Sequence, residues 1–100
     1  MKFLHKHRND ILRLIYNHGF TEHDFDFVKK RGRIHVIHKA SKSYFSYFKK
    51  KETSIHPITK QWQQNSYYKY QKSNQRELVI DNWLLVVEEM QAWMSGLGQE

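Results

Sequence analysis

The chain has 100 residues, no cysteine and a formal charge of +7, and 39% of its residues are hydrophobic. This length and apolar content predict one domain with one hydrophobic core. The missing cysteines exclude disulfides, thiolate zinc sites and cysteine nucleophiles. Because no apolar run has the length of a signal-peptide core or a bilayer span, we expect a cytoplasmic protein.

The positive charge is unevenly distributed along the chain. Residues 28–60 carry ten lysines and arginines against Glu52 as the single acid, whereas residues 76–100 carry Arg76 against five acids. A basic segment of this kind attracts polyanions such as nucleic acid or anionic lipid. It would equally attract an acidic protein surface, so charge leaves the partner open.

A first helix is predicted from about Phe3 to His18. Leu4, Ile11, Leu14, Ile15 and His18 recur at helical spacing on one face. Gly19 and Phe20 then form a typical helix stop, in which the glycine takes a left-handed conformation and the next apolar residue folds back.

Alternating residues predict an antiparallel meander after this helix. Phe25 and Phe27 alternate with acids in a first strand, and residues 34–38 form a second strand after a turn at Gly32. Residues 43–48 are aromatic on both faces, which favours a central position for the third strand.

Periodicity fades between Lys49 and Asn74. Three lysines at 49–51 and His56-Pro57 indicate an exposed excursion, and part of residues 51–64 is expected to be mobile. A further strand is predicted around Ser66 to Tyr70.

A second helix is predicted from Arg76 to Leu97. Asn74 with Glu77 resembles a capping box at its start. The apolar stripe is wider than one sheet face requires, so the first helix, the aromatic loop or a second copy of the chain must cover the rest.

The seven histidines do not have the spacing of a metal site. His35 and His38 fall on opposite faces of a strand, and His5 and His7 point apart on a helix. Phosphate-binding loops, nucleophile elbows and paired buried acids are also missing from the sequence. We therefore expect no metal, no small-molecule cofactor and no enzymatic activity.

The clearest positive feature is the interleaving of basic and aromatic residues across 28–72. Such residues on a sheet can bind nucleic acid, since bases stack on rings and cations meet phosphates. In the alternative interpretation, the aromatic rings form the hydrophobic core and the lysines only keep the protein soluble. The predicted polyanion-binding residues are Lys29, Lys30, Arg31, Arg33, Lys49, Lys50 and Lys51.

The second helix offers a different surface. Trp83 and Trp93 lie ten residues apart and look in similar directions, which is typical of core anchors. One of them could instead join a protein interface, where tryptophan and methionine are enriched. The predicted interface residues are Leu85, Trp93, Met94 and Leu97.

Several of these motifs together resemble a group of small bacterial α+β domains of unknown function. The matching pieces are Gly19-Phe20, Ser43-Tyr44-Phe45, Ile55-His56-Pro57, and a closing helix with Trp83, Trp93, Leu97 and Glu100. The loop element of that group is altered here to His56-Pro57-Ile58. The resemblance covers nearly the full chain and implies a compact binding or adaptor module, without a ligand.

The sequence therefore predicts a single α+β domain with an N-terminal helix, a three- to four-stranded antiparallel meander and a long C-terminal helix packed on the sheet. The leading functional hypothesis is a non-catalytic interaction module that binds a protein partner or a second copy of itself. The alternative is a nucleic-acid-binding domain that uses residues 28–72.

Overall fold

The computed structural model describes residues 7–97 and confirms the α+β class. In chain order it contains α1 (Arg8–Asn17), the short 3-10 helix η1 (Glu22–Asp24), β1 (Phe25–Lys30), β2 (Arg33–His38), β3 (Tyr44–Ile55), β4 (Trp62–Lys72), β5 (Leu78–Ile80) and α2 (Trp83–Leu97). The strands form one antiparallel sheet in the order β1-β2-β3-β4-β5. This meander has more strands than the three or four that the sequence predicts.

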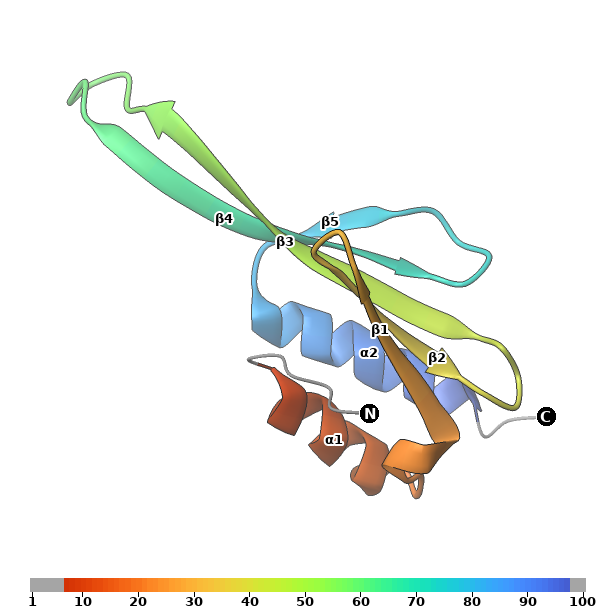
Figure 1. Cartoon of the computed structure of the whole chain (residues 1–100). Coiled ribbons are helices and arrows are strands. Elements are labelled where there is room, and N and C mark those ends of the chain that lie inside the picture. The colour runs from red at the N-terminus through yellow and green to blue at the C-terminus, as the bar shows by residue number, and fades with distance from the viewer. Residues whose placement is uncertain (1–6, 98–100) are drawn as a thin grey trace.

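The two helices lie together on one side of the sheet, so the molecule has two layers (Figure 1). The core between these layers contains Ile11 and Ile15 of α1, Val86 and Met90 of α2, and Phe45 of β3, all of which are fully buried. Burial of these side chains is the main favourable contribution to folding. None of the helices in the described part of the chain is long and apolar enough to cross a membrane.

Strand alternation separates the two faces of the sheet as predicted. Phe25 and Phe27 are buried, and Phe45 and Tyr47 face the helices from the central strand β3. Tyr44 and Phe48 of the same strand therefore lie on the opposite face, which confirms that β3 is aromatic on both sides.

The end of α1 confirms the predicted glycine stop. Gly19 has a φ of +80°, and the amide of Phe20 donates to the carbonyl of Ile15 at 3.0 Å, the hydrogen bond of a Schellman motif. Phe20 packs against the core. The predicted start of this helix at about Phe3 is too early, because α1 begins at Arg8 and His7 lies in a turn. Leu4, His5 and Glu100 lie outside the described residues.

The predicted start of the second helix at Arg76, with Asn74 as its cap, is wrong. Asn74 lies in the turn between β4 and β5 with a φ of +63°, and residues 78–80 pair with β4 as an edge strand. Helix α2 begins at Trp83, where the Oδ1 atom of Asn82 accepts the amide of Leu85 at 3.1 Å. The apolar run Leu78-Val79-Ile80 suits a strand as well as a helix, and pairing with β4 decides between them.

The strand predicted around Ser66 to Tyr70 is confirmed as part of β4, and residues 49–66 are mostly exposed as expected, but the predicted excursion is a paired hairpin. Strands β3 and β4 stay paired from Phe45↔Lys72 to Ile55↔Trp62, and the outer part of this hairpin projects beyond the other strands (Figure 1). We call residues 50–67 the arm. The arm accounts for the elongated dimensions of the molecule, 53 × 27 × 23 Å.

Candidate functional site

The face of the sheet opposite α1 and α2 carries no helix among the described residues (Figure 1), and we call it the bare face. Strand alternation places Arg33, His35 and Ile37 of β2 on this face, next to Tyr44 and Phe48 of β3. All five side chains are half-buried. The bare face therefore combines basic and aromatic groups that remain partly open to solvent.

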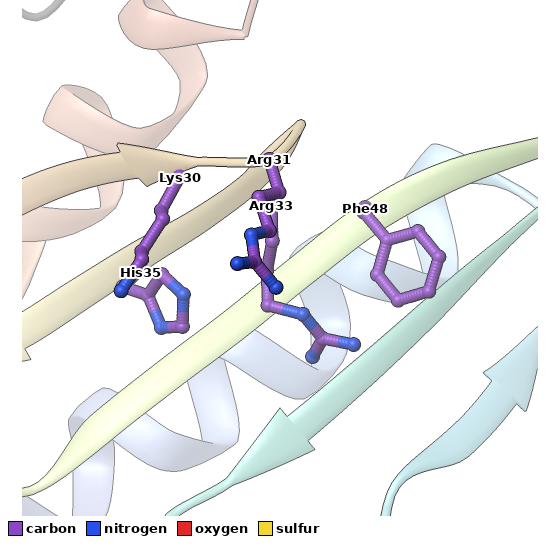
Figure 2. Close-up of a pocket in the computed structure, with 5 residues that line it drawn as sticks. All are labelled: Lys30, Arg31, Arg33, His35 and Phe48. Carbon is purple, nitrogen blue, oxygen red and sulfur yellow. The ribbon is translucent and has the colours of Figure 1, made fainter.

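The turn between β1 and β2 brings several of the predicted cations together. Lys30, Arg31 and Arg33 line a hollow of about 300 Å³ with His35 and Phe48, and Figure 2 shows the Arg31 and Arg33 side chains between Lys30 and His35 on one side and Phe48 on the other. The guanidinium carbon of Arg33 lies 4.4 Å from the centroid of that ring. This geometry is a cation–π contact, which holds both groups in place.

The second predicted run of lysines lies next to the same turn. Ile34 pairs with Tyr47, so the residues after Tyr47 pass the tip of the β1–β2 hairpin, and Gly32 and Lys49 line a common hollow of about 120 Å³. The fold thereby joins two basic runs that are separate in the sequence. We call the region of Lys29, Lys30, Arg31, Arg33, Lys49, Lys50 and Lys51 the arm base.

The seven predicted cations do not all share one face. Lys30, Arg33 and Lys50 are on the bare face, whereas alternation turns Lys29, Lys49 and Lys51 toward the helix side, beyond the helices themselves. The positive charges of the arm base therefore lie on both faces of the sheet at the point where the arm begins.

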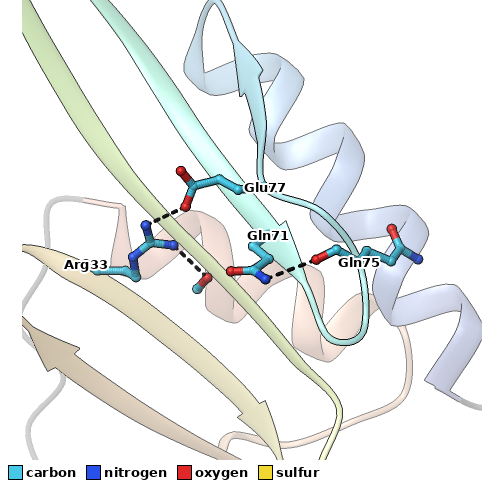
Figure 3. Close-up of polar contacts among 5 residues, drawn as sticks. Arg33, Gln71, Gln75 and Glu77 are labelled. Atoms are coloured by element: carbon cyan, nitrogen blue, oxygen red, sulfur yellow. Dashed lines mark hydrogen bonds and ion pairs between the residues drawn. The ribbon is translucent and has the colours of Figure 1, made fainter.

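Arg33 is the least available of these cations. Its Nη2 atom donates to Glu77 Oε2 at 2.5 Å and its Nη1 atom donates to Ser46 Oγ at 3.2 Å (Figure 3). In contrast, Lys30, Arg31, Lys50 and Lys51 are exposed, and no carboxylate of residues 7–97 pairs with them. Together with Lys29 and Lys49, which are also exposed, these four side chains supply the accessible positive charge of the arm base.

His35 adds little charge at neutral pH. Partial burial, followed by the positive charges of Arg33 and Lys30, holds the pKa of His35 below its usual value. The ring is therefore neutral near pH 7. An anion bound in the hollow would favour its protonated form, and the histidine could then donate from both ring nitrogens.

A second hollow of about 520 Å³ continues along β2 and β3 on the bare face. It shares Arg33 and His35 with the first hollow, its floor includes Ile37 and Tyr44, and Lys42 lies at its far side. The two hollows form one shallow trough with cations at both ends. Such a trough can hold an extended anionic chain with its apolar parts on the floor.

The predicted interface on α2 is not an exposed surface. Trp93 and Met94 are only 7% and 1% exposed. The Trp93 ring lies 6.0 Å from those of Phe25 and Phe45, and its Nε1 atom donates to Ser43 Oγ at 2.9 Å. Leu85 and Leu97 are half-buried. Trp93 and Met94 belong to the hydrophobic core and Leu97 packs against it, as the core-anchor interpretation of Trp93 predicts. Leu84 of the same helix remains 74% exposed.

The histidines and acids do not gather into a metal site within residues 7–97. His35 lies on the bare face, and His38 faces the core at 9% exposure and bonds Ser41 Oγ at 2.8 Å. The predicted separation of these two histidines is therefore confirmed.

Arg31 gives one testable property of this site. The two central residues of the β1–β2 turn have φ angles of +53° at Arg31 and +78° at Gly32, the pattern of a type I′ turn. Asparagine tolerates this conformation better than arginine. We expect Arg31→Asn to raise the free energy of unfolding by about 0.5–1 kcal/mol, measured by urea denaturation.

Lys30→Asn is the matched control, because it removes one charge from the same hollow at a position with ordinary strand geometry. It should give no gain in stability. Equal changes in the two variants would mean that charge repulsion, and not backbone conformation, governs this turn.

Comparison with known proteins adds no relative to this description. No family model matches the chain, and neither a search of curated proteins nor a search of solved structures finds a similar one.

Proposed function

We propose that this chain is a non-catalytic nucleic-acid-binding domain whose principal contact surface is the arm base. The observation that carries the proposal is the meeting of two basic runs, residues 29–33 and 49–51, at one place on the fold. Clustered lysines and arginines bind phosphates and release condensed counterions, which provides most of the free energy of nonspecific binding.

The bare face supports the same proposal. Tyr44 and Phe48 are half-buried rings next to Lys42 and Arg33, and such rings can stack on bases or sugars while cations meet phosphates. Two acids, Glu77 and Glu52, lie at or next to the arm base, whereas Glu88 and Glu89 lie on α2, where Glu89 accepts hydrogen bonds from Tyr70 and Lys72 on the helix side. This polarity would orient a polyanion toward the arm base.

The proposal predicts binding that depends steeply on salt. We expect the full chain to bind labelled oligonucleotides of roughly 20 nucleotides, single- and double-stranded, in about 50 mM salt. If four or five cations contact phosphates, the logarithm of the duplex binding constant should fall with the logarithm of salt with a slope of about −4. Fluorescence anisotropy across a salt series measures this slope.

Two outcomes would contradict the proposal. One is the absence of binding to any oligonucleotide at the lowest salt. The other is binding that does not change with salt, because contact with phosphates necessarily releases counterions.

A protein partner, or a second copy of the chain, is the other candidate function. It is favoured by one observation: Ile55, Ile58 and Trp62 at the end of the arm are 52%, 83% and 73% exposed. Exposed apolar side chains that cluster are typical of contact surfaces. Light scattering at high protein concentration tests the second copy, which predicts twice the mass of the monomer.

A further inference from the structure

The arm has the dimensions of a probe that reaches away from the body. Six residue pairs, from Lys50↔Tyr67 to Ile55↔Trp62, extend it by about 17 Å at the usual rise of a strand. A turn closes it, in which the amide of His56 donates to the carbonyl of Gln61 at 2.9 Å. The arm contributes little to the core, since Tyr67, Ser54 and His56 are half-buried and its other side chains are exposed.

The side chains of the arm are arranged in three zones along its length. Lys50 and Lys51 stand at the arm base. The middle carries amides and hydroxyls on both faces, and Ile55, Ile58 and Trp62 stand at the tip with Lys60 between them in sequence. The middle zone consists of Glu52, Thr53, Ser54, Gln63, Gln64, Asn65 and Ser66, and the Glu52 carboxylate accepts a hydrogen bond from the Tyr67 hydroxyl at 2.8 Å.

The middle zone indicates whether the arm binds a lipid surface or a nucleic acid. A hairpin that enters a lipid surface has to remove its polar groups from water, and each amide without a partner costs free energy there. The edges of bases offer such amides direct partners, because glutamine and asparagine can bond the N6 and N7 atoms of adenine in two places. The amides between the apolar tip and the lysines at the arm base therefore favour a nucleic-acid groove over a lipid surface.

The width of the arm decides which groove it fits. A two-stranded ribbon fits the major groove of B-form DNA, which is about 12 Å wide, whereas the minor groove is about 6 Å wide. The major groove of an RNA duplex is too narrow for side chains to read. The same geometry thus separates duplex DNA from duplex RNA.

We propose that the arm enters the major groove of duplex DNA, with its amides and hydroxyls at base edges, its apolar tip against thymine methyl groups, and the arm base on the flanking phosphates. This inference rests on the proposed function and adds a ligand class to it. The arm base holds any nucleic acid by charge, and the arm adds a preference for B-form duplex.

The test compares three ligands of one sequence: duplex DNA, duplex RNA and single-stranded DNA, each of roughly 20 nucleotides per strand. We expect the full chain to bind duplex DNA about tenfold more tightly than duplex RNA. The double variant Ile58→Ser, Trp62→Gln should lose this preference and keep the weaker, salt-dependent binding to all three ligands. Fluorescence anisotropy at fixed salt measures the ratios.

Leu84→Ser is the matched control, because Leu84 is 74% exposed and belongs to α2 and not to the arm. It removes exposed apolar surface and should leave all three affinities unchanged. A second variant shortens the arm by replacing residues 53–64 with Asn-Gly, a sequence suited to a two-residue turn. His56 and Gln61 form a hydrogen-bonded pair, and hydrogen-bonded and non-hydrogen-bonded pairs alternate along an antiparallel hairpin. Glu52 and Asn65 therefore also form a hydrogen-bonded pair, which a two-residue turn can join.

The outcomes separate this inference from the proposed function. Equal binding of duplex DNA and duplex RNA, unchanged in both arm variants, overturns the role of the arm and leaves the charge-based function standing. The absence of binding to every nucleic acid overturns both. Two results with the tip variant would also overturn the inference. A change in molecular mass in solution would mean that the tip binds a second copy of the chain. Loss of binding to anionic vesicles, with DNA binding intact, would mean that the tip binds lipid.

Discussion

Replacing Phe45 by alanine should lower the free energy of unfolding by about 3–5 kcal/mol, the cost typical of a phenylalanine truncated in a closed core. Phe45 is 0% exposed at the centre of β3. Its ring stacks on Tyr70 at 5.6 Å between centroids and lies 6.0 Å from that of Trp93. The side chain thus fills the space between the sheet and α2. Since domains of this size are stable by about 5–15 kcal/mol, the variant should be partly unfolded by moderate urea or heat.

Phe48→Ala is the control for this experiment, because Phe48 lies on the same strand but on the bare face. It is half-buried and contacts Arg33, so the expected loss is about 1 kcal/mol. Urea denaturation followed by circular dichroism gives both values. Equal losses at the two positions would contradict the two-layer arrangement, in which only one face of the sheet is sealed. If the alanine variant does not fold, Phe45→Leu should still lose more than Phe48→Leu.

The elements that could be predicted are those whose pattern reflects one buried face. Phe25 and Phe27 alternate because their strand has helices on one side, and Gly19 ends α1 because its positive φ is favourable for glycine. The central place of β3 follows from aromatic residues on both of its faces. In each case the local residues carry the whole signal.

The start of α2 could not be predicted, because it depends on a distant strand. Leu78, Val79 and Ile80 continue the apolar pattern of the helix backwards without interruption. Pairing of these residues with Tyr68, Lys69 and Tyr70 of β4 converts them into a strand. The usable signal was Asn82, which is a good helix cap placed just before Trp83.

The hairpin that forms the arm was not predicted, because its residues lack the local pattern of a buried strand. Both of its faces are in water, so residues 50–67 show neither the alternation of a half-buried strand nor the run of a buried one. Its strands are held by the ladder that continues from the sheet. A turn over residues 56–61, with β-forming or polar residues on both sides, was the signal that could have indicated a hairpin.

The candidate site was predicted as a set of residues but not as a place. The basic runs at 29–33 and 49–51 were identified from charge, and the register Ile34↔Tyr47 brings them together. The ion pair that engages Arg33 depends on Glu77, which lies far away in the sequence. The same argument explains why Trp93 and Met94 are buried: the packing of α2 on the sheet, where Trp93 contacts Phe25 and Phe45, is a tertiary property.

Reversing three charges of the arm base should almost abolish nucleic-acid binding. The triple variant Arg31→Glu, Lys50→Glu, Lys51→Glu takes exposed cations from both basic runs. Each lost phosphate contact removes about 0.9 from the salt slope for duplex DNA. At 0.1 M salt, three lost contacts lower the binding constant on the order of a few hundredfold, and repulsion from the new carboxylates lowers it further. Fluorescence anisotropy across a salt series measures both the affinity and the slope.

The matched control reverses three cations elsewhere: Arg8→Glu, Arg13→Glu and Arg76→Glu. Arg8 and Arg13 lie on α1, on the helix side of the sheet, and Arg76 precedes β5. Both variants change the net charge by the same amount, so long-range attraction to the polyanion weakens similarly in the two. If the arm base is a contact surface, only the first variant should also lose about three units of slope. Equal losses of affinity and slope would mean that the domain attracts polyanions by net charge and has no defined binding site.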